Sequence, residues 1–194
     1  MDGFEKRTKE KMKAIEEVTI SMLNMELNDI KIADIAKKAK VSQVTIYNYY
    51  GSKEKLIESA VKGLIDEQVQ KFEEIIDADH TFKEKLQQFF NLKRHIACKI
   101  NMLKLAEEDK KYGELLSSYY KKILPSFIKF IQTGREKGFI RESVKNETLT
   151  FYLRLIDESL SHLNECSMPN AEYEQIPGEI LDLLLYGILK QDNI

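Results

Sequence analysis

The segment KIADIAKKAKVSQVTIYNYYGSK, residues Lys31 to Lys53, decides how this chain folds. Its apolar residues recur at helical spacing from Ile32 to Ala39, and a second short apolar stripe runs from Ile46 to Tyr50. The break between the two stripes ends at Ser42, whose hydroxyl can accept from the first backbone N–H groups of the following helix. The segment therefore predicts a helix-turn-helix, in which two short helices cross closely.

The second helix of this motif is expected to present a chemically mixed outer face. Amide, hydroxyl, methyl and phenol groups can contact base edges and phosphates in a DNA major groove. The segment carries five lysines against the single acid Asp34, whereas the whole chain has a formal net charge of -2. A solvated lysine face is the alternative interpretation of such a run, and its coincidence with the turn motif favours nucleic acid. The outward residues are Gln43, Val44, Thr45, Tyr47, Asn48 and Tyr49.

Length and composition indicate a cytoplasmic protein with a sizeable core. At 194 residues and 43% hydrophobic, the chain fits two small domains that share a long helix. It has no run of about 18 apolar residues that could span a membrane, and its charged beginning lacks the apolar region of a signal peptide. Two distant cysteines, Cys98 and Cys166, form no disulfide framework and suit a reducing compartment.

Helical periodicity continues through the remaining sequence, and no segment has the sustained alternation of a β-strand. The apolar stripe after Ser52 persists to about Asp77. Such a helix would be about 40 Å long and should connect two domains. Thr81 and Glu84 form a capping box, and Pro125 is expected to kink or split a later helix. Besides the motif, the predicted helices span about residues 8–25, 52–77, 81–103, 114–134, 146–165 and 177–190.

The last predicted helix, residues 177–190, is apolar around much of its circumference. The outer helix of a monomer would carry a polar face toward water. A second subunit is the simplest cover for it, so the sequence predicts a homodimer.

No constellation of residues indicates an enzyme, a metal site or a cofactor. The sequence contains no HExxH, no Gly-rich phosphate loop and no Gly-x-Ser-x-Gly. His80, His95 and His162 belong to no recognisable set of metal ligands. Aromatic runs are more typical of a core, and their helical positions also make some of them candidates for a small-molecule pocket. The candidate pocket residues are Phe89, Met102, Tyr119, Tyr120 and Tyr152.

Four pieces of the motif occur in a diagnostic order: Ile35-Ala36, Val41-Ser42, the run Thr45 to Tyr50, and Ser52-Lys53-Glu54-Lys55-Leu56. Together they resemble the DNA-binding signature of TetR-family transcriptional regulators. The resemblance implies an all-α homodimer with an N-terminal three-helix head. The head, residues 8–64, would be joined by the long helix to a C-terminal ligand-binding and dimerisation domain, residues 65–194. Helices near 146–165 and 177–190 of both subunits would form the dimer interface.

The resemblance also implies roles for individual residues. Tyr47 and Lys53 correspond to residues that contact phosphate, while Tyr50 corresponds to a buried aromatic. Asn48 and Tyr49 would contact the DNA backbone, and the first residues of the second helix would contact bases and sugars. The implied DNA-binding set is Lys31, Ser42, Gln43, Val44, Thr45, Tyr47, Asn48, Tyr49 and Lys53.

Three residues depart from the family pattern. Lys40 stands where the turn commonly has Gly, so a left-handed backbone there would cost about 1 kcal/mol or more. Val44 replaces a frequent Gly and points a branched side chain toward the DNA, and Lys31 replaces a usual Thr. These departures leave the predicted fold intact and bear on which operator sequence is read.

The sequence thus predicts a DNA-binding transcriptional regulator. In the leading hypothesis it is a repressor that a small-molecule ligand releases from a pseudo-palindromic operator. The alternative is a helical dimer that binds a small molecule or a partner and carries a vestigial head, an interpretation that Lys40 and Val44 support. A helical enzyme is the third possibility, which no acid-base or metal set supports.

Overall fold

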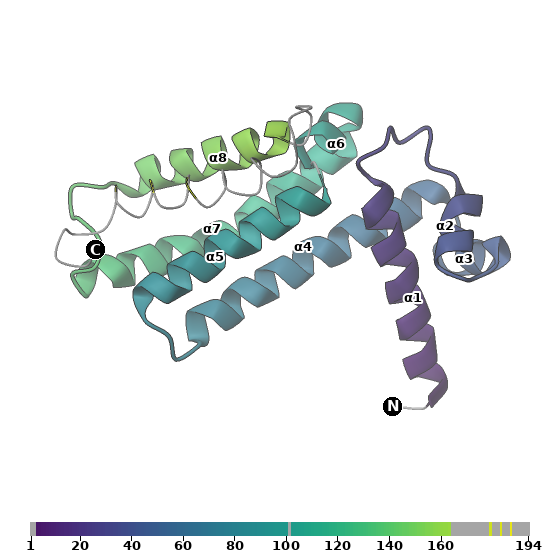
Figure 1. Cartoon of the computed structure of the whole chain (residues 1–194), viewed down its shortest axis with the longest axis horizontal. Coiled ribbons are helices and arrows are strands. Elements are labelled where there is room, and N and C mark those ends of the chain that lie inside the picture. Colours follow the sequence, from purple (N-terminus) through teal and green to yellow (C-terminus); the bar gives the residue numbers. More distant parts are fainter. Residues whose placement is uncertain (1–2, 101, 164–178, 180–182, 184–186, 188–194) are drawn as a thin grey trace.

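The structure is a computed structural model that describes residues 3–100 and 102–163, together with positions 179, 183 and 187. Within that part the chain forms eight α-helices and no β-strand, so the predicted all-α class is confirmed. None of the described helices combines the length and apolar character needed to cross a bilayer. Figure 1 shows three helices gathered at one end of a single long helix, with a larger bundle stacked along the rest of it.

The three N-terminal helices, the head, are α1 (Gly3–Met22), α2 (Ile32–Lys38) and α3 (Gln43–Tyr50). The first helix begins before the predicted residue 8 and ends before the predicted residue 25. All three helices share one core, because each contributes a residue with no exposed surface. These residues are Ile15, Ile35 and Ile46.

The long helix α4 (Lys53–Asp77) has the predicted bounds. It begins because the Ser52 hydroxyl accepts a hydrogen bond from the Lys55 N–H at 3.2 Å. It packs against α1 and α3 of the head and also against α5 and α7 of the bundle. Its buried residues run from Leu56 to Phe72, so one continuous helix belongs to both cores.

The rest of the described chain forms a helical bundle with an aromatic core. The ring of Phe89 lies 4.7 Å from that of Phe72 and 4.9 Å from that of Phe127, measured between centroids. The first bundle helix begins with the predicted capping box of Thr81 and Glu84. The helices of the bundle are α5 (Phe82–Lys99), α6 (Met102–Glu108), α7 (Lys110–Glu136) and α8 (Asn146–Leu163).

The structure corrects two details predicted for the bundle helices. The helix that begins after Thr81 ends at Lys99, because Ile100 is buried in an extended conformation (φ -154°, ψ 133°). Of the two outcomes predicted at Pro125, a kink or a split, the split does not occur, since α7 continues through the proline as one helix. Proline removes one backbone donor, and the buried neighbours Ile123 and Phe127 hold the helix together on both sides.

Candidate nucleic-acid interface

The turn between α2 and α3 is built by local hydrogen bonds. The N–H of Val41 donates to the carbonyl of Ala36 at 3.0 Å, which closes the end of α2. Lys40 has φ of 55°, the left-handed conformation that the comparison with glycine anticipated. The Ser42 hydroxyl then caps α3 by accepting from the Thr45 N–H at 3.0 Å. The predicted helix-turn-helix and its cap are therefore confirmed.

The inner face of α3 is anchored to α1. Ile46 is fully buried, and Tyr50 is 8% exposed. The Tyr50 hydroxyl donates toward the carbonyl of Met12 at 3.3 Å and the Glu16 carboxylate at 3.2 Å. Burial, and next the nearby Glu16 carboxylate, raise the pKa of Tyr50 well above its usual range, so it stays a neutral donor. Tyr50 is thus a structural anchor, as predicted.

The outer face of α3 is open to solvent. Val44 is 66% exposed and Tyr47 49% exposed, and Gln43, Asn48 and Tyr49 are also exposed. An exposed valine and two exposed tyrosines on one short helix are costly to leave in water and suit a surface that contacts another molecule.

Thr45 differs from the other residues assigned to that face. It is half-buried, and its hydroxyl lies 2.8 Å from the Ser42 hydroxyl. The Thr45 side chain therefore helps the predicted cap Ser42 to organise the start of α3, a contribution that the outward position of Thr45 in the sequence did not predict.

Four of the five lysines of the motif are exposed on or next to α2 and in the turn that follows it. Lys31, Lys37, Lys38 and Lys40 are all exposed, and Lys31 immediately precedes α2. The concentration of lysines found in the sequence is thus available at the surface. Positive charge of this kind attracts the phosphates of a DNA backbone.

Lys53 stands at the first position of α4, as the sequence implied, and it also makes contacts within the head that the sequence did not predict. Its ammonium donates to the carbonyls of Leu27 at 2.9 Å and Ile30 at 3.2 Å, and its side chain is half-buried. It therefore holds the connection between α1 and α2 against the start of α4. An ammonium has three donors, so one remains for a phosphate. The sequence gave no sign of this role, because the two acceptors lie 26 and 23 residues away.

Replacing Lys40 by glycine is expected to raise the free energy of unfolding by about 1 kcal/mol. A left-handed backbone destabilises the folded state by roughly 1–2 kcal/mol for an ordinary residue but not for glycine. The larger conformational entropy of glycine in the unfolded chain offsets part of this stabilisation. Chemical denaturation would measure the change. Lys40→Ala is the control, because it also removes the lysine but keeps a Cβ at positive φ. Equal stability of the two variants would contradict the assignment of strain.

The candidate pocket residues are only partly brought together. A cavity of about 20 Å³ in the bundle is lined by Phe89 and Tyr120. The other three candidates, Met102, Tyr119 and Tyr152, do not line it, and Tyr119 is buried in the core. The complete lining is Phe89, Lys93, Tyr120, Ile123, Leu124, Phe127, Thr150 and Arg154.

Three polar residues of the bundle were missed by sequence reasoning. The Lys93 ammonium is buried 5.2 Å from the centroid of the Tyr119 ring, and the Arg154 guanidinium lies 5.8 Å from that of Tyr120. Gln68 on α4 is 2% exposed, and its Oε1 accepts no hydrogen bond from the described residues. A buried acceptor without a donor is costly. The periodicity of the sequence does not distinguish these three residues from polar residues on the surface of a helix.

The described residues contain no group of three or more His, Cys, Asp or Glu side chains that could hold a metal ion.

Comparison with protein families finds a match to the helix-turn-helix segment. The sequence profile described as "Bacterial regulatory proteins, tetR family" matches residues 27–60. This segment contains α2, α3, the turn between them and the beginning of α4. No curated protein sequence matches the chain.

Comparison with solved structures finds the same arrangement of helices over nearly the whole chain. A TetR-family regulator from Agrobacterium tumefaciens has a TM-score of 0.75 at 12% identity, covering 94% of this chain and 100% of that one. The ketosteroid transcriptional regulator KstR2 of Mycobacterium tuberculosis has a TM-score of 0.65 at 19% identity, covering 94% and 96%. The fatty acid degradation regulator FadR from Bacillus halodurans has a TM-score of 0.69 at 19% identity, covering 91% and 95%. These similarities establish the fold.

Proposed function

We propose that this chain is a TetR-type helix-turn-helix transcriptional regulator, and specifically a cytoplasmic repressor that a small-molecule effector releases from a pseudo-palindromic operator. The observation that best supports the proposal is the composition of the outer face of α3. Its exposed amide, methyl and phenol groups lie on the opposite side of the helix from the buried Ile46 and Tyr50, and the motif also carries four exposed lysines. A rigid helix that presents such groups on its solvent side matches the requirements of a major groove.

Each side chain of this face has a proposed partner in DNA. The amide of Gln43 can pair with adenine, and the methyl groups of Val44 can meet the methyl of thymine. Tyr47 would contact a phosphate, as would the remaining donor of Lys53. Sequence would then be read near the beginning of α3. The other members of the proposed interface are Lys31, Ser42, Thr45, Asn48 and Tyr49.

We assign DNA binding to residues 8–64 and ligand binding and dimerisation to residues 65–194. The proposed boundary falls inside α4, whose buried residues continue from the head into the bundle. A movement of the bundle can therefore reach the head through a single rigid element, since no loop separates the two parts along α4.

We propose a homodimer through α8 and the predicted helix 177–190. On α8, Phe151 is 64% exposed and Leu155 41% exposed, and their spacing of four residues places them on one face. Of the predicted helix 177–190 only positions 179, 183 and 187 lie within the described residues, and Leu183 is exposed there. Exposed large apolar side chains on adjacent turns support a subunit interface.

Replacing Phe151 and Leu155 together by aspartate is expected to weaken the dimer by at least about a hundredfold, because buried apolar anchors dominate interfaces. Sedimentation velocity over a concentration series would show monomer where the original protein shows dimer. Glu142→Arg, a charge change in the connection before α8, is the control and should leave the dimer intact. A dimer of unchanged affinity in the aspartate variant would refute this interface.

The proposed effector site lies in the bundle around Phe89 and Tyr120, with Met102, Tyr119 and Tyr152 as further candidates. A cavity of about 20 Å³ is far below the roughly 300–1,000 Å³ of a typical ligand site. The effector would therefore bind a more open conformation and shift the population toward it, which requires a higher affinity for that conformation. Gln68 does not line this cavity, but its Oε1, which accepts no hydrogen bond from the described residues, could accept one from a ligand that opens the bundle as far as α4.

Selection of bound duplexes from a random DNA library tests the proposal. We expect a pseudo-palindrome whose half-sites lie about one helical turn, roughly 34–36 Å, apart or at a related spacing. Binding should weaken steeply as salt concentration rises. Failure to enrich any duplex, together with binding that does not respond to salt, would instead favour a helical dimer with a vestigial head.

A further inference from the structure

Helix α6 lies against the head and contacts it through charged groups. The Lys104 ammonium is 2.9 Å from the Glu26 carboxylate, and the Leu27 N–H donates to the Glu108 carboxylate at 3.1 Å. Both head residues belong to the connection between α1 and α2. Figure 1 shows α6 beside this part of the head, at the end of the bundle nearest to it.

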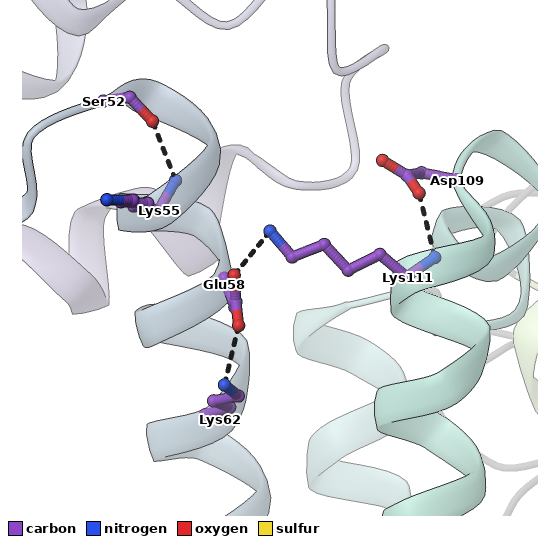
Figure 2. Close-up of polar contacts among 6 residues, drawn as sticks. All are labelled: Ser52, Lys55, Glu58, Lys62, Asp109 and Lys111. Atoms are coloured by element: carbon purple, nitrogen blue, oxygen red, sulfur yellow. Dashed lines mark hydrogen bonds and ion pairs between the residues drawn. The ribbon is translucent and has the colours of Figure 1, made fainter.

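A second contact joins the same corner to α4. The Lys111 ammonium, at the start of α7, lies 2.6 Å from the Glu58 carboxylate. Figure 2 shows Glu58 between Lys111 and Lys62, with the start of α7 fixed by the Asp109 carboxylate, which accepts from the Lys111 N–H. Hydrogen bonds from Lys111 and then Lys62 lower the pKa of Glu58 to about 2, so the carboxylate is ionised at neutral pH.

Leu27 connects these contacts to the reading helix. Its N–H is held by Glu108 of α6, while its carbonyl is held by Lys53 at the first position of α4. Only Gly51 and Ser52 separate Lys53 from the end of α3. Leu27 therefore connects α6 of the bundle, through its N–H, with Lys53, shortly after the reading helix α3, through its carbonyl.

We propose that Lys104, Glu108 and Lys111 form a polar joint with Glu26, Leu27 and Glu58 that sets the angle of the head to the bundle. The part of this inference that concerns operator spacing rests on the proposed function. Deeper in the bundle, aromatic rings join α4 to α5 and α7. A close-packed core of this kind does not deform gradually, so it resists small changes of the angle between the helices. Exposed ion pairs are individually weak, so this joint can be broken by modest differences in ligand affinity between two conformations.

The variant Lys104→Glu tests the joint, because it replaces the attraction between residues 104 and 26 by repulsion. The double variant Glu26→Lys/Lys104→Glu exchanges the two charges and should restore the ion pair. In the intact protein without DNA, amide hydrogen exchange in residues 23–31 is expected to become about tenfold faster in the single variant and to return toward the original rate in the swap. Lys122→Glu is the matched control. It breaks another ion pair between α4 and α7, Lys122 with Asp66 at 2.6 Å, which involves none of the joint residues. Its exchange rates in residues 23–31 should not change.

Affinity for the selected operator and for versions lengthened or shortened by one base pair provides the second measurement. The original protein should discriminate among these spacings, whereas Lys104→Glu should bind them within about threefold of one another, because a looser head adapts to each. Unchanged exchange, or faster exchange with unchanged discrimination, would overturn the proposal. If the original protein bound no duplex, the proposed function would fail, and the exchange measurement would still decide whether the joint exists.

Discussion

Replacing Gln43 and Tyr47 together by alanine is expected to reduce affinity for the selected operator roughly a hundredfold, about 2.8 kcal/mol. Both side chains are exposed on α3, and neither makes a hydrogen bond with the described residues. A hydrogen-bonded base contact contributes about 1–3 kcal/mol of discrimination, and loss of a phosphate contact adds to it. The free energy of unfolding should change by less than about 0.5 kcal/mol, as for other surface positions.

The double variant should be compared with Gln132→Ala, a change at an exposed glutamine of α7. Fluorescence anisotropy with a labelled operator would measure both affinities at the same salt concentration, because electrostatic binding depends strongly on salt. Circular dichroism would confirm that the helices are intact. A loss of less than threefold in the double variant would mean that α3 does not read the operator through this face.

Replacing Gly134 by alanine is expected to lower the free energy of unfolding by about 2 kcal/mol, the cost of overpacking less the higher helix propensity of alanine. A Cβ at this position would lie 2.5 Å from two atoms of the Phe82 ring. That ring is stacked between Phe130, at 4.7 Å, and Phe139, at 5.4 Å. The ring therefore has little room to move away, and either α7 or the aromatic stack must shift.

Gly63→Ala provides the matched control in another helix. A Cβ there would meet only the Glu16 carboxylate, at 3.7 Å, an ordinary contact. Alanine should thus stabilise α4 by up to about 1 kcal/mol. Urea denaturation of both variants would show changes of opposite sign. Equal stability of Gly134→Ala and the original protein would contradict the close packing of α7 on Phe82.

The beginnings of several helices could be predicted from the sequence. Ser42, Ser52 and Thr81 each accept a hydrogen bond from the backbone N–H three residues later. A cap and its partner lie within one turn, so the residue type and its position suffice. The left-handed backbone of Lys40 was anticipated differently, from the resemblance to a family that commonly has Gly at this position.

For the candidate site, the sequence predicted which side chains of α3 are exposed but not the long-range contacts around them. Helical periodicity correctly separated the exposed Val44 and Tyr47 from the buried Ile46. It could not show that Lys53 donates to carbonyls of the connection between α1 and α2, or that Glu108 contacts Leu27 across 81 residues. Contacts of that kind depend on how whole helices pack, and neither partner carries a local signal.

By itself the sequence determined the all-α class, the helix-turn-helix, the length of α4 and the outer face of α3, because each of these follows from spacing and capping within a few turns. Only the tertiary structure decided that Ile100 is extended and that α7 continues through Pro125. It also decided that the α6–α7 corner docks onto the head. In these cases burial against distant helices outweighs local preference, because packing supplies most of the stability of a helix in a protein.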